Sequence, residues 1–241
     1  MKDSSWKALK IMKLPADEEG IFLERPNRFL GKVALKGKTV MVHVHDPGRL
    51  PDLLFPGTPV LLKHAQSPKR KTAFSLIAAR KDNHWIFVNS GYHRRLTGAL
   101  LKKLGQEIFP GLKEFQAEPK FDGGRLDYLL KFKSQEEMLV EVKGCTWAKG
   151  EIALFPDAPT TRGQKHLRHL LELKQKGLNA CLWLLVFRPE ATCFRPAEEI
   201  DPLFAGLFSE ALKEGLTLKI SRILYDGKNL FFGGELPLCS A

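Results

Sequence analysis

The sequence predicts a mixed α+β fold with two parts: a small N-terminal β-barrel, then a mixed sheet flanked by helices. Six short strand-like runs fill residues 21–88, strand and helix patterns alternate after residue 89, and a hairpin pattern spans residues 125–143. A chain of 241 residues with 44% hydrophobic residues is long and apolar enough for one large or two small domains. We expect domains at residues 1–88 and 89–241.

The N-terminal part begins without a clear period, so we expect residues 1–19 to form a loosely held arm. The strand-like runs that follow are separated by turn sequences such as Pro26-Asn27 and Pro56-Gly57. They cover residues 21–24, 29–35, 39–45, 59–65, 73–79 and 85–88. This density of short strands is typical of a small barrel, and the OB-fold is a leading candidate; the OB assignment itself depends largely on the resemblance described below.

The charge of the chain is uneven. Its formal net charge is +11, and residues 1–88 contain 16 Lys and Arg against 8 Asp and Glu, whereas residues 89–241 contain 22 against 19. A basic barrel suggests a polyanionic partner. The candidate nucleic-acid contacts here are Arg25, Asn27, Arg28, Lys32, Arg49, Lys69, Arg70 and Lys71. For the 69–71 loop, a solvated turn is an equally good interpretation.

Three rings in the barrel have two interpretations each. Phe29 can stack on a base or belong to the core. His43 and His45 share a strand face, which is compatible with a metal pair. Without a third ligand nearby in the sequence, we interpret them as ordinary strand histidines near the binding face.

The second part begins after a break at residues 89–91. Leu96, Leu100, Leu101 and Leu104 have helical spacing, and we expect this helix to end at Gly105. Further strands are expected at residues 112–118, 151–155 and 216–224, with an edge strand at 228–232. The apolar run 180–187 predicts a central strand that is covered on both faces. Helices are expected at 162–176, with Thr160 or Thr161 as N-cap, and at 200–213, beginning near Asp201.

The hairpin at residues 125–143 contains the candidate catalytic residues. Folding it at Ser134–Gln135 places Asp127 opposite Glu141 or Lys143 on one face. Two carboxylates with an open side suit magnesium or manganese, and a carbonyl near Val142 would be a further ligand. The metal and Lys143 would offset charge during phosphodiester cleavage. A cross-strand ion pair on a solvated face is the alternative.

Further polar residues flank this hairpin and would orient the DNA backbone. They are Arg125 and, on the first turn of the 162–176 helix, Arg162, Gln164 and Lys165; His166 lies on the same turn. A helix N-terminus favours phosphate binding, although a solvated first turn is the alternative. We expect Lys143 to lie at an exposed position.

Several motifs together resemble the sugar fermentation stimulation protein family of bacteria and archaea. They are the sequences Arg25-Pro26-Asn27-Arg28-Phe29, Asp46-Pro47-Gly48-Arg49-Leu50, Arg125-Leu126-Asp127, Glu141-Val142-Lys143-Gly144, Phe155 to Thr160 and Arg162 to Leu167. The hairpin itself resembles the PD-(D/E)xK nuclease superfamily. The resemblance implies an OB-like domain at 1–88, a nuclease-like domain at 89–241 and DNA binding.

The sequence departs from this resemblance at three positions. Residues 92–105 contain no acid, and Gly98 lies where many superfamily members have one. Thr161 replaces an acid before Arg162-Gly163, and Gly124 replaces a small polar residue. The missing acids weaken the expectation of a second metal ion and of turnover.

The functional hypothesis is a DNA-binding protein with magnesium- or manganese-dependent nuclease activity and low sequence specificity. The alternative is a non-catalytic DNA-binding regulator of sugar-utilisation genes that retains the nuclease fold. An RNA-binding OB protein is a third, less supported class. The oligomeric state is open, and a homo-oligomer is compatible with the sequence.

The cysteines and the apolar runs indicate a cytoplasmic protein without a membrane partner. Cys145, Cys181, Cys193 and Cys239 form no Cys-x-x-Cys pair, so we expect reduced, mostly buried thiols. The N-terminus lacks the pattern of a signal peptide. The longest apolar run, 180–187, is too short to span a bilayer.

Overall fold

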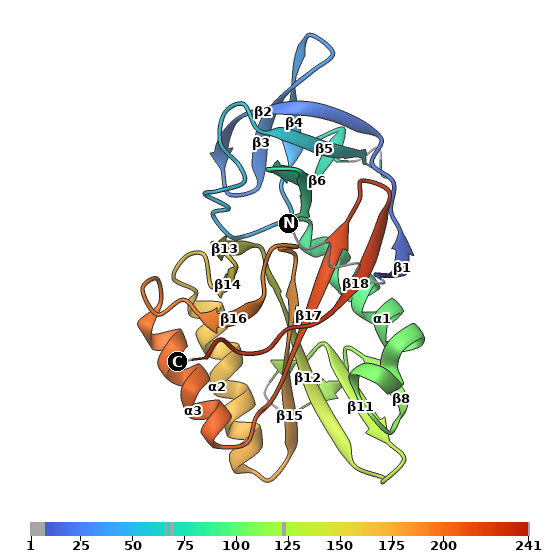
Figure 1. The fold of residues 1–241 in the computed structure, drawn as a ribbon, viewed down its shortest axis with the longest axis vertical. Coiled ribbons are helices and arrows are strands. Elements are labelled where there is room, and N and C mark those ends of the chain that lie inside the picture. Colours follow the sequence, from blue (N-terminus) through green and yellow to red (C-terminus); the bar gives the residue numbers. More distant parts are fainter. Residues whose placement is uncertain (1–7, 66, 68–69, 122–123, 241) are drawn as a thin grey trace.

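The computed structural model describes residues 8–65, 67, 70–121 and 124–240. It consists of a barrel followed by a mixed sheet with helices on its faces, so the predicted fold class is confirmed (Figure 1). The strands follow the order β4-β3-β2-β5-β6-β7-β17-β15-β12-β11-β8. The barrel joins the sheet where β7 pairs with β17, at Trp85 and Tyr225.

In the barrel, buried side chains alternate with less buried ones along β3 and come in consecutive runs along β5 and β6. Its parallel β4–β6 pairing, at Val42 with Phe74 and at His43 with Ser75, completes the closure. Phe22, Val33 and Val42 are at most 1% exposed, as expected for the inner face of a small barrel. The strands are β2 (Glu18–Asn27), β3 (Leu30–Leu35), β4 (Lys38–His43), β5 (Pro59–His64), β6 (Phe74–Lys81) and β7 (His84–Phe87).

The prediction of a loose N-terminal arm is wrong from Leu9 onward. Strand β1 (Leu9–Lys13) pairs antiparallel with β18 (Asn229–Glu235). Burial of Ile11 and Met12 stabilises this pairing. Because β18 has β17 on one side and β1 on the other, it is not an edge strand. The partner strands are more than 200 residues apart, so no local pattern could reveal this pairing. Residues 1–7 lie outside the described residues.

The sheet of the second part has β15 at its centre, as predicted. Its neighbours β12 and β17 both run parallel to it. Trp183 of β15 is fully buried and donates its indole N–H to Ser221 Oγ at 2.9 Å. The remaining strands extend the sheet on both sides. Their bounds are β8 (Leu112–Ala117), β11 (Tyr128–Phe132), β12 (Glu137–Cys145), β15 (Asn179–Val186) and β17 (Thr217–Tyr225).

The helices cover this sheet, with α2 and α3 side by side and α1 on the other side of the molecule (Figure 1). After the short turn η1 (Ser90–Tyr92), α1 spans His93–Ile108, so it does not end at Gly105. Glycine is needed there because a Cβ would lie 2.7 Å from Leu112 Cδ2. Helix α2 (Thr161–Gln175) is capped by Thr160, which accepts from the Gly163 N–H at 3.0 Å. Asp201 caps α3 (Pro202–Lys213) in the same way.

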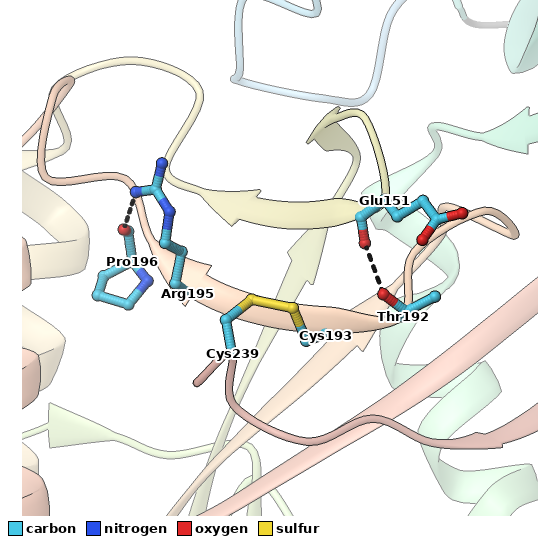
Figure 2. The surroundings of a disulfide bond; sticks show 6 residues. All are labelled: Glu151, Thr192, Cys193, Arg195, Pro196 and Cys239. Carbon is cyan, nitrogen blue, oxygen red and sulfur yellow. Dashed lines mark hydrogen bonds between the residues drawn. A yellow bond between two sulfur atoms is a disulfide. The ribbon is translucent and has the colours of Figure 1, made fainter. Parts of the chain in front are cut away.

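A small third sheet lies between the barrel and helices α2 and α3, and the C-terminal segment runs beside it (Figure 1). Cys193 and Cys239 form a disulfide there, so the prediction of four reduced cysteines is wrong (Figure 2). The backbone N–H of Cys239 donates to the carbonyl of Phe194 at 2.9 Å, which brings the cysteines together. Cys145 and Cys181 are free and buried. The short strands are β9 (Lys120–Phe121), β10 (Gly124–Arg125), β13 (Trp147–Lys149), β14 (Ile152–Phe155) and β16 (Cys193–Pro196).

The helices carry no membrane signal. Among those in the described ranges, none is long and apolar enough to cross a bilayer.

The barrel and the second part are interlocked at the 46–50 loop. Asp157, from the turn after β14, accepts from the Leu50 N–H at 2.8 Å. Leu50 has a φ of 53°, a conformation that a branched residue rarely adopts, and this bond fixes it. Gly48 packs so closely against Asp157 that a Cβ would lie 2.6 Å from its carboxylate. Asp46 lies in the same loop, and burial and the charge of Asp157 raise its pKa to about 6.

Asp46 makes the stability of the fold depend on pH. Because its pKa in the folded state lies above the ordinary value of 3.8, its proton stabilises the fold below about pH 4, and this contribution is lost as the pH rises through about 6. Asp46→Asn keeps an oxygen for the Gly48 N–H but does not titrate. We expect the free energy of unfolding of the wild type, relative to Asp46→Asn, to fall by on the order of 2 kcal/mol between pH 4 and 7. Urea titrations of both proteins between pH 4 and 7 measure this difference in the free energy of unfolding. A difference that does not change with pH would contradict the prediction.

Candidate metal and nucleic-acid site

The hairpin of β11 and β12 brings the predicted carboxylates together. The last paired residues are Tyr128 and Val140, and the Asp127 N–H donates to the Val140 carbonyl at 3.0 Å. Continuing this register by one residue sets Asp127 opposite Glu141. Directly opposed residues of an antiparallel pair share a face, so the two carboxylates are neighbours. Of the two registers that the sequence left open, the structure adopts this one.

Glu141 is the most enclosed charged group of the site, since its side chain is only 4% exposed. Its Oε1 contacts the ammonium of Lys143 and Nδ1 of His166, which comes from α2. Burial acts to raise the pKa of Glu141, but the His166 hydrogen bond and the Lys143 charge outweigh it and lower the pKa. The carboxylate is therefore ionised and held in a fixed position. The Lys143 side chain is 17% exposed, so the expectation of an exposed lysine is wrong.

Asp127 is oriented by the backbone of the neighbouring strand. Its Oδ2 accepts from the Val142 N–H at 2.7 Å. Burial and the charge of Glu141 raise its pKa. The N–H and C=O of one strand residue point to the same side of the strand, so the Val142 carbonyl lies on the Asp127 side, beyond the end of β11. Asp127, Glu141 and this carbonyl therefore border one space.

The donor set suits a hard divalent cation. Two carboxylates and a carbonyl are oxygen ligands, and magnesium keeps several waters as its remaining ligands. Within the described ranges, no three His, Cys, Asp or Glu side chains are placed as a complete metal site. The fit therefore depends on the Val142 carbonyl and on water.

His93, the first residue of α1, packs against the end of the Glu-x-Lys sequence. Its ring stacks on Phe187, with centroids 5.2 Å apart, and a Cβ on Gly144 would overlap it. Burial and the nearby Lys143 charge lower the pKa of His93 to about 4, so the ring is neutral. Gly144 thus allows the start of α1 to lie directly against the site.

Two of the predicted DNA contacts have structural roles instead. Arg25 donates to four backbone carbonyls, those of Arg28, Asp46, Gly48 and Arg49, at 2.7–2.8 Å. Its guanidinium therefore organises the 46–50 loop rather than facing a ligand. Gln164 donates to both oxygens of Asp201 at 3.0 and 3.1 Å and ties α2 to α3. Both donors find partners that are distant in the sequence.

The other predicted contacts remain available at the surface or support turns. Asn27 accepts from the Phe29 N–H at 2.9 Å. Arg70 is anchored within its own loop by Ser75 Oγ at 2.8 Å. Lys69 lies outside the described residues. The exposed basic residues are Arg28, Arg49, Lys71, Arg125, Arg162 and Lys165.

Three residues of the site had no assigned role in the sequence. His166 was noticed only as part of a helix N-terminus, although it lies four residues after Arg162 and so projects from the same helix face. Asp157 belongs to a quoted motif, but its contact with Leu50 spans 107 residues. The role of His93 had no sequence signal, because it depends on a contact with Gly144.

Comparisons with known proteins cover both parts of the chain and confirm the resemblance. Residues 91–229 match the sugar fermentation stimulation protein RE domain, and residues 23–88 match the SfsA N-terminal OB domain. A sugar fermentation stimulation protein homolog of Methanococcoides burtonii is 43% identical, covering 95% of each chain. A homolog of Thermotoga petrophila is 42% identical, covering 94% of this chain and 97% of the relative.

Among solved structures, Pyrococcus furiosus SfsA in complex with Ca2+ is similar over 97% of this chain and 100% of that chain. The TM-score is 0.89 at 26% sequence identity.

The contact between Gly144 and His93 predicts the effect of a single methyl group. Gly144→Ala should destabilise the protein by about 1–3 kcal/mol, because the His93 ring, which stacks on Phe187, occupies the space of the new methyl group. Adding His93→Ala should recover part of this loss, which a double-mutant cycle from urea titrations would measure. Gly206→Ala in α3 is the control, since no atom lies within 4 Å of its Cβ position. Additive effects of the two substitutions would contradict the contact.

Proposed function

The chain belongs to the sugar fermentation stimulation protein family, and we propose that it binds DNA with low sequence preference and cleaves phosphodiester bonds at Asp127 and Glu141 with bound magnesium or manganese. The pairing of these two carboxylates beside Lys143 carries the proposal. The similar protein of Pyrococcus furiosus was solved with Ca2+, another cation that takes oxygen ligands. The Val142 carbonyl, which lies on the Asp127 side beyond the end of β11, would be a further oxygen ligand for the ion.

In this proposal, Asp127, Glu141 and the Val142 carbonyl hold the ion. When bound there, a divalent ion would supply Lewis acidity to the phosphate and would lower the pKa of a water molecule. Lys143 lies next to Glu141 and offsets the negative charge that develops on the phosphate oxygens. His166 holds Glu141 from the side of α2, so the carboxylate does not need to reorganise. The neighbouring exposed cations, Arg125, Arg162 and Lys165, would orient the DNA backbone.

The test of cleavage compares Lys143→Gln with the wild type. Loss of the ammonium should lower the rate on the order of a hundredfold or more, while DNA binding should change little because other cations contact phosphates. The readout is metal-dependent cleavage of single- and double-stranded DNA with magnesium or manganese, against chelator. Because Lys143 is largely buried against Glu141, the variant should also lose some thermal stability, which must be measured in parallel.

Two further variants separate catalysis from folding. In Asp127→Asn the amide oxygen can still accept from the Val142 N–H, but the variant should bind manganese weakly, as measured by calorimetry. Asp201→Asn is the control: it changes a carboxylate at a helix cap and should leave manganese binding unchanged. If the unmodified protein cleaves no form of DNA with either metal, the nuclease proposal fails. Retained DNA binding would then favour the non-catalytic regulator.

DNA binding should depend steeply on salt, because the barrel carries most of the charge excess. In the full chain, Arg49→Ala and Lys71→Ala should each reduce the slope of log K against log salt by about one. Both side chains are exposed, so folding should be preserved. Arg25→Ala is the contrasting variant: it should lower the melting temperature because four carbonyls lose their donor. An unchanged slope in both surface variants would move the binding surface away from the barrel.

A further inference from the structure

The barrel presents a row of rings at the end of β2 and along β4. Phe29, in the turn between β2 and β3, is 50% exposed. Its ring stacks on His43, with an interplanar angle of 20° and centroids 6.4 Å apart. His43 in turn meets His45 edge to face at 4.1 Å. We call these three residues the ring platform. An exposed phenylalanine alone would be unremarkable, but here it continues a row of rings.

The ring platform is flanked by positive charge. Arg70, in the loop between β5 and β6, is fixed by Ser75 Oγ and Thr72 Oγ1 at 2.8 and 3.3 Å. Burial and then the Arg70 charge lower the pKa of His43, and the same two causes contribute for His45. Both imidazoles are therefore neutral near pH 7 and offer flat ring faces. Flat faces beside fixed cations are the combination that holds single-stranded nucleic acid.

The ring platform is adjacent to the candidate metal site through one short turn. Ser90 of η1 donates to the His45 carbonyl, and a Cβ on Gly91 would lie 3.4 Å from His45 Nδ1. Two residues later, His93 packs against Gly144, next to Lys143. Residues 90–93 therefore link the backbone of His45 in the ring platform to the strand that carries Glu141 and Lys143.

We propose that the ring platform stacks an unpaired base, so that the DNA this protein takes contains a single-stranded segment beside the Asp127–Glu141 site. The inference deepens the proposed function and rests on its DNA-binding part. In an intact duplex each base face is covered by its neighbours, so only an unpaired or terminal base offers a free face to Phe29. Stacking tolerates any base, which agrees with low sequence preference.

The experiment uses the full chain in chelator, so that binding is measured without cleavage. The probes are oligonucleotides with 2-aminopurine, whose fluorescence falls on stacking, as single strand, as blunt duplex and as duplex with a single-stranded overhang. The fluorescence should fall on binding of the single strand and the overhang. Phe29→Ala should weaken their binding about 5- to 100-fold and leave duplex binding nearly unchanged. Phe55→Ala is the matched control, since Phe55 is 48% exposed in the same domain.

The inference is overturned if Phe29→Ala weakens duplex and single-strand binding equally, or if it behaves like Phe55→Ala. Because the Phe29 backbone contacts do not involve its ring, the variant should fold, and its melting temperature checks this. His43→Leu is the second variant and should also reduce the fluorescence change. If the protein binds only duplex DNA and still cleaves DNA, this inference is wrong but the proposed function stands. If the fluorescence change depends on Phe29 but the protein cleaves no DNA, the nuclease proposal is wrong and this inference stands.

Discussion

The packing of His93 on Gly144 is the contact on which the arrangement of this protein depends. Without a side chain at Gly144, the first turn of α1 reaches the strand that carries Glu141 and Lys143. The same helix follows directly from the barrel through η1. The absence of a Cβ at Gly144 therefore lets the start of α1 lie against the strand that carries the carboxylates. A larger residue there would overlap the His93 ring.

The pKa values of the two carboxylates in the site follow from their burial and from the groups that contact them. Glu141 stays ionised although it is buried, since His166 and Lys143 both contact one of its oxygens. Asp127 next to it has a raised pKa because burial and its neighbour act in the same direction. The charge of Lys143 offsets part of the repulsion between the two carboxylates, and a divalent cation bound as proposed above would offset more of it.

The interface between the two parts adds polar contacts to an apolar core that residues of both parts share. Asp157 reaches from the second part into the 46–50 loop, and Arg188 binds Asp52 at 2.6 Å. Strands β1 and β18 add a pairing between the two ends of the chain. These contacts hold the barrel in one orientation, which a DNA strand spanning the ring platform and the carboxylates would require.

The sequence alone determined the fold class, most strands and helices, a cap at Thr160 or Thr161, a helix start near Asp201, and a hairpin that brings Asp127 close to Glu141 or Lys143. These features follow from local periodicity, turn chemistry and a hairpin of short contact order. Only the tertiary structure decided the β1–β18 pairing, the Cys193–Cys239 disulfide, the structural use of Arg25 and the positions of His93 and His166. Each of these depends on partners tens to hundreds of residues away, and a linear pattern of hydrophobicity or charge carries no information about which distant group satisfies a given donor.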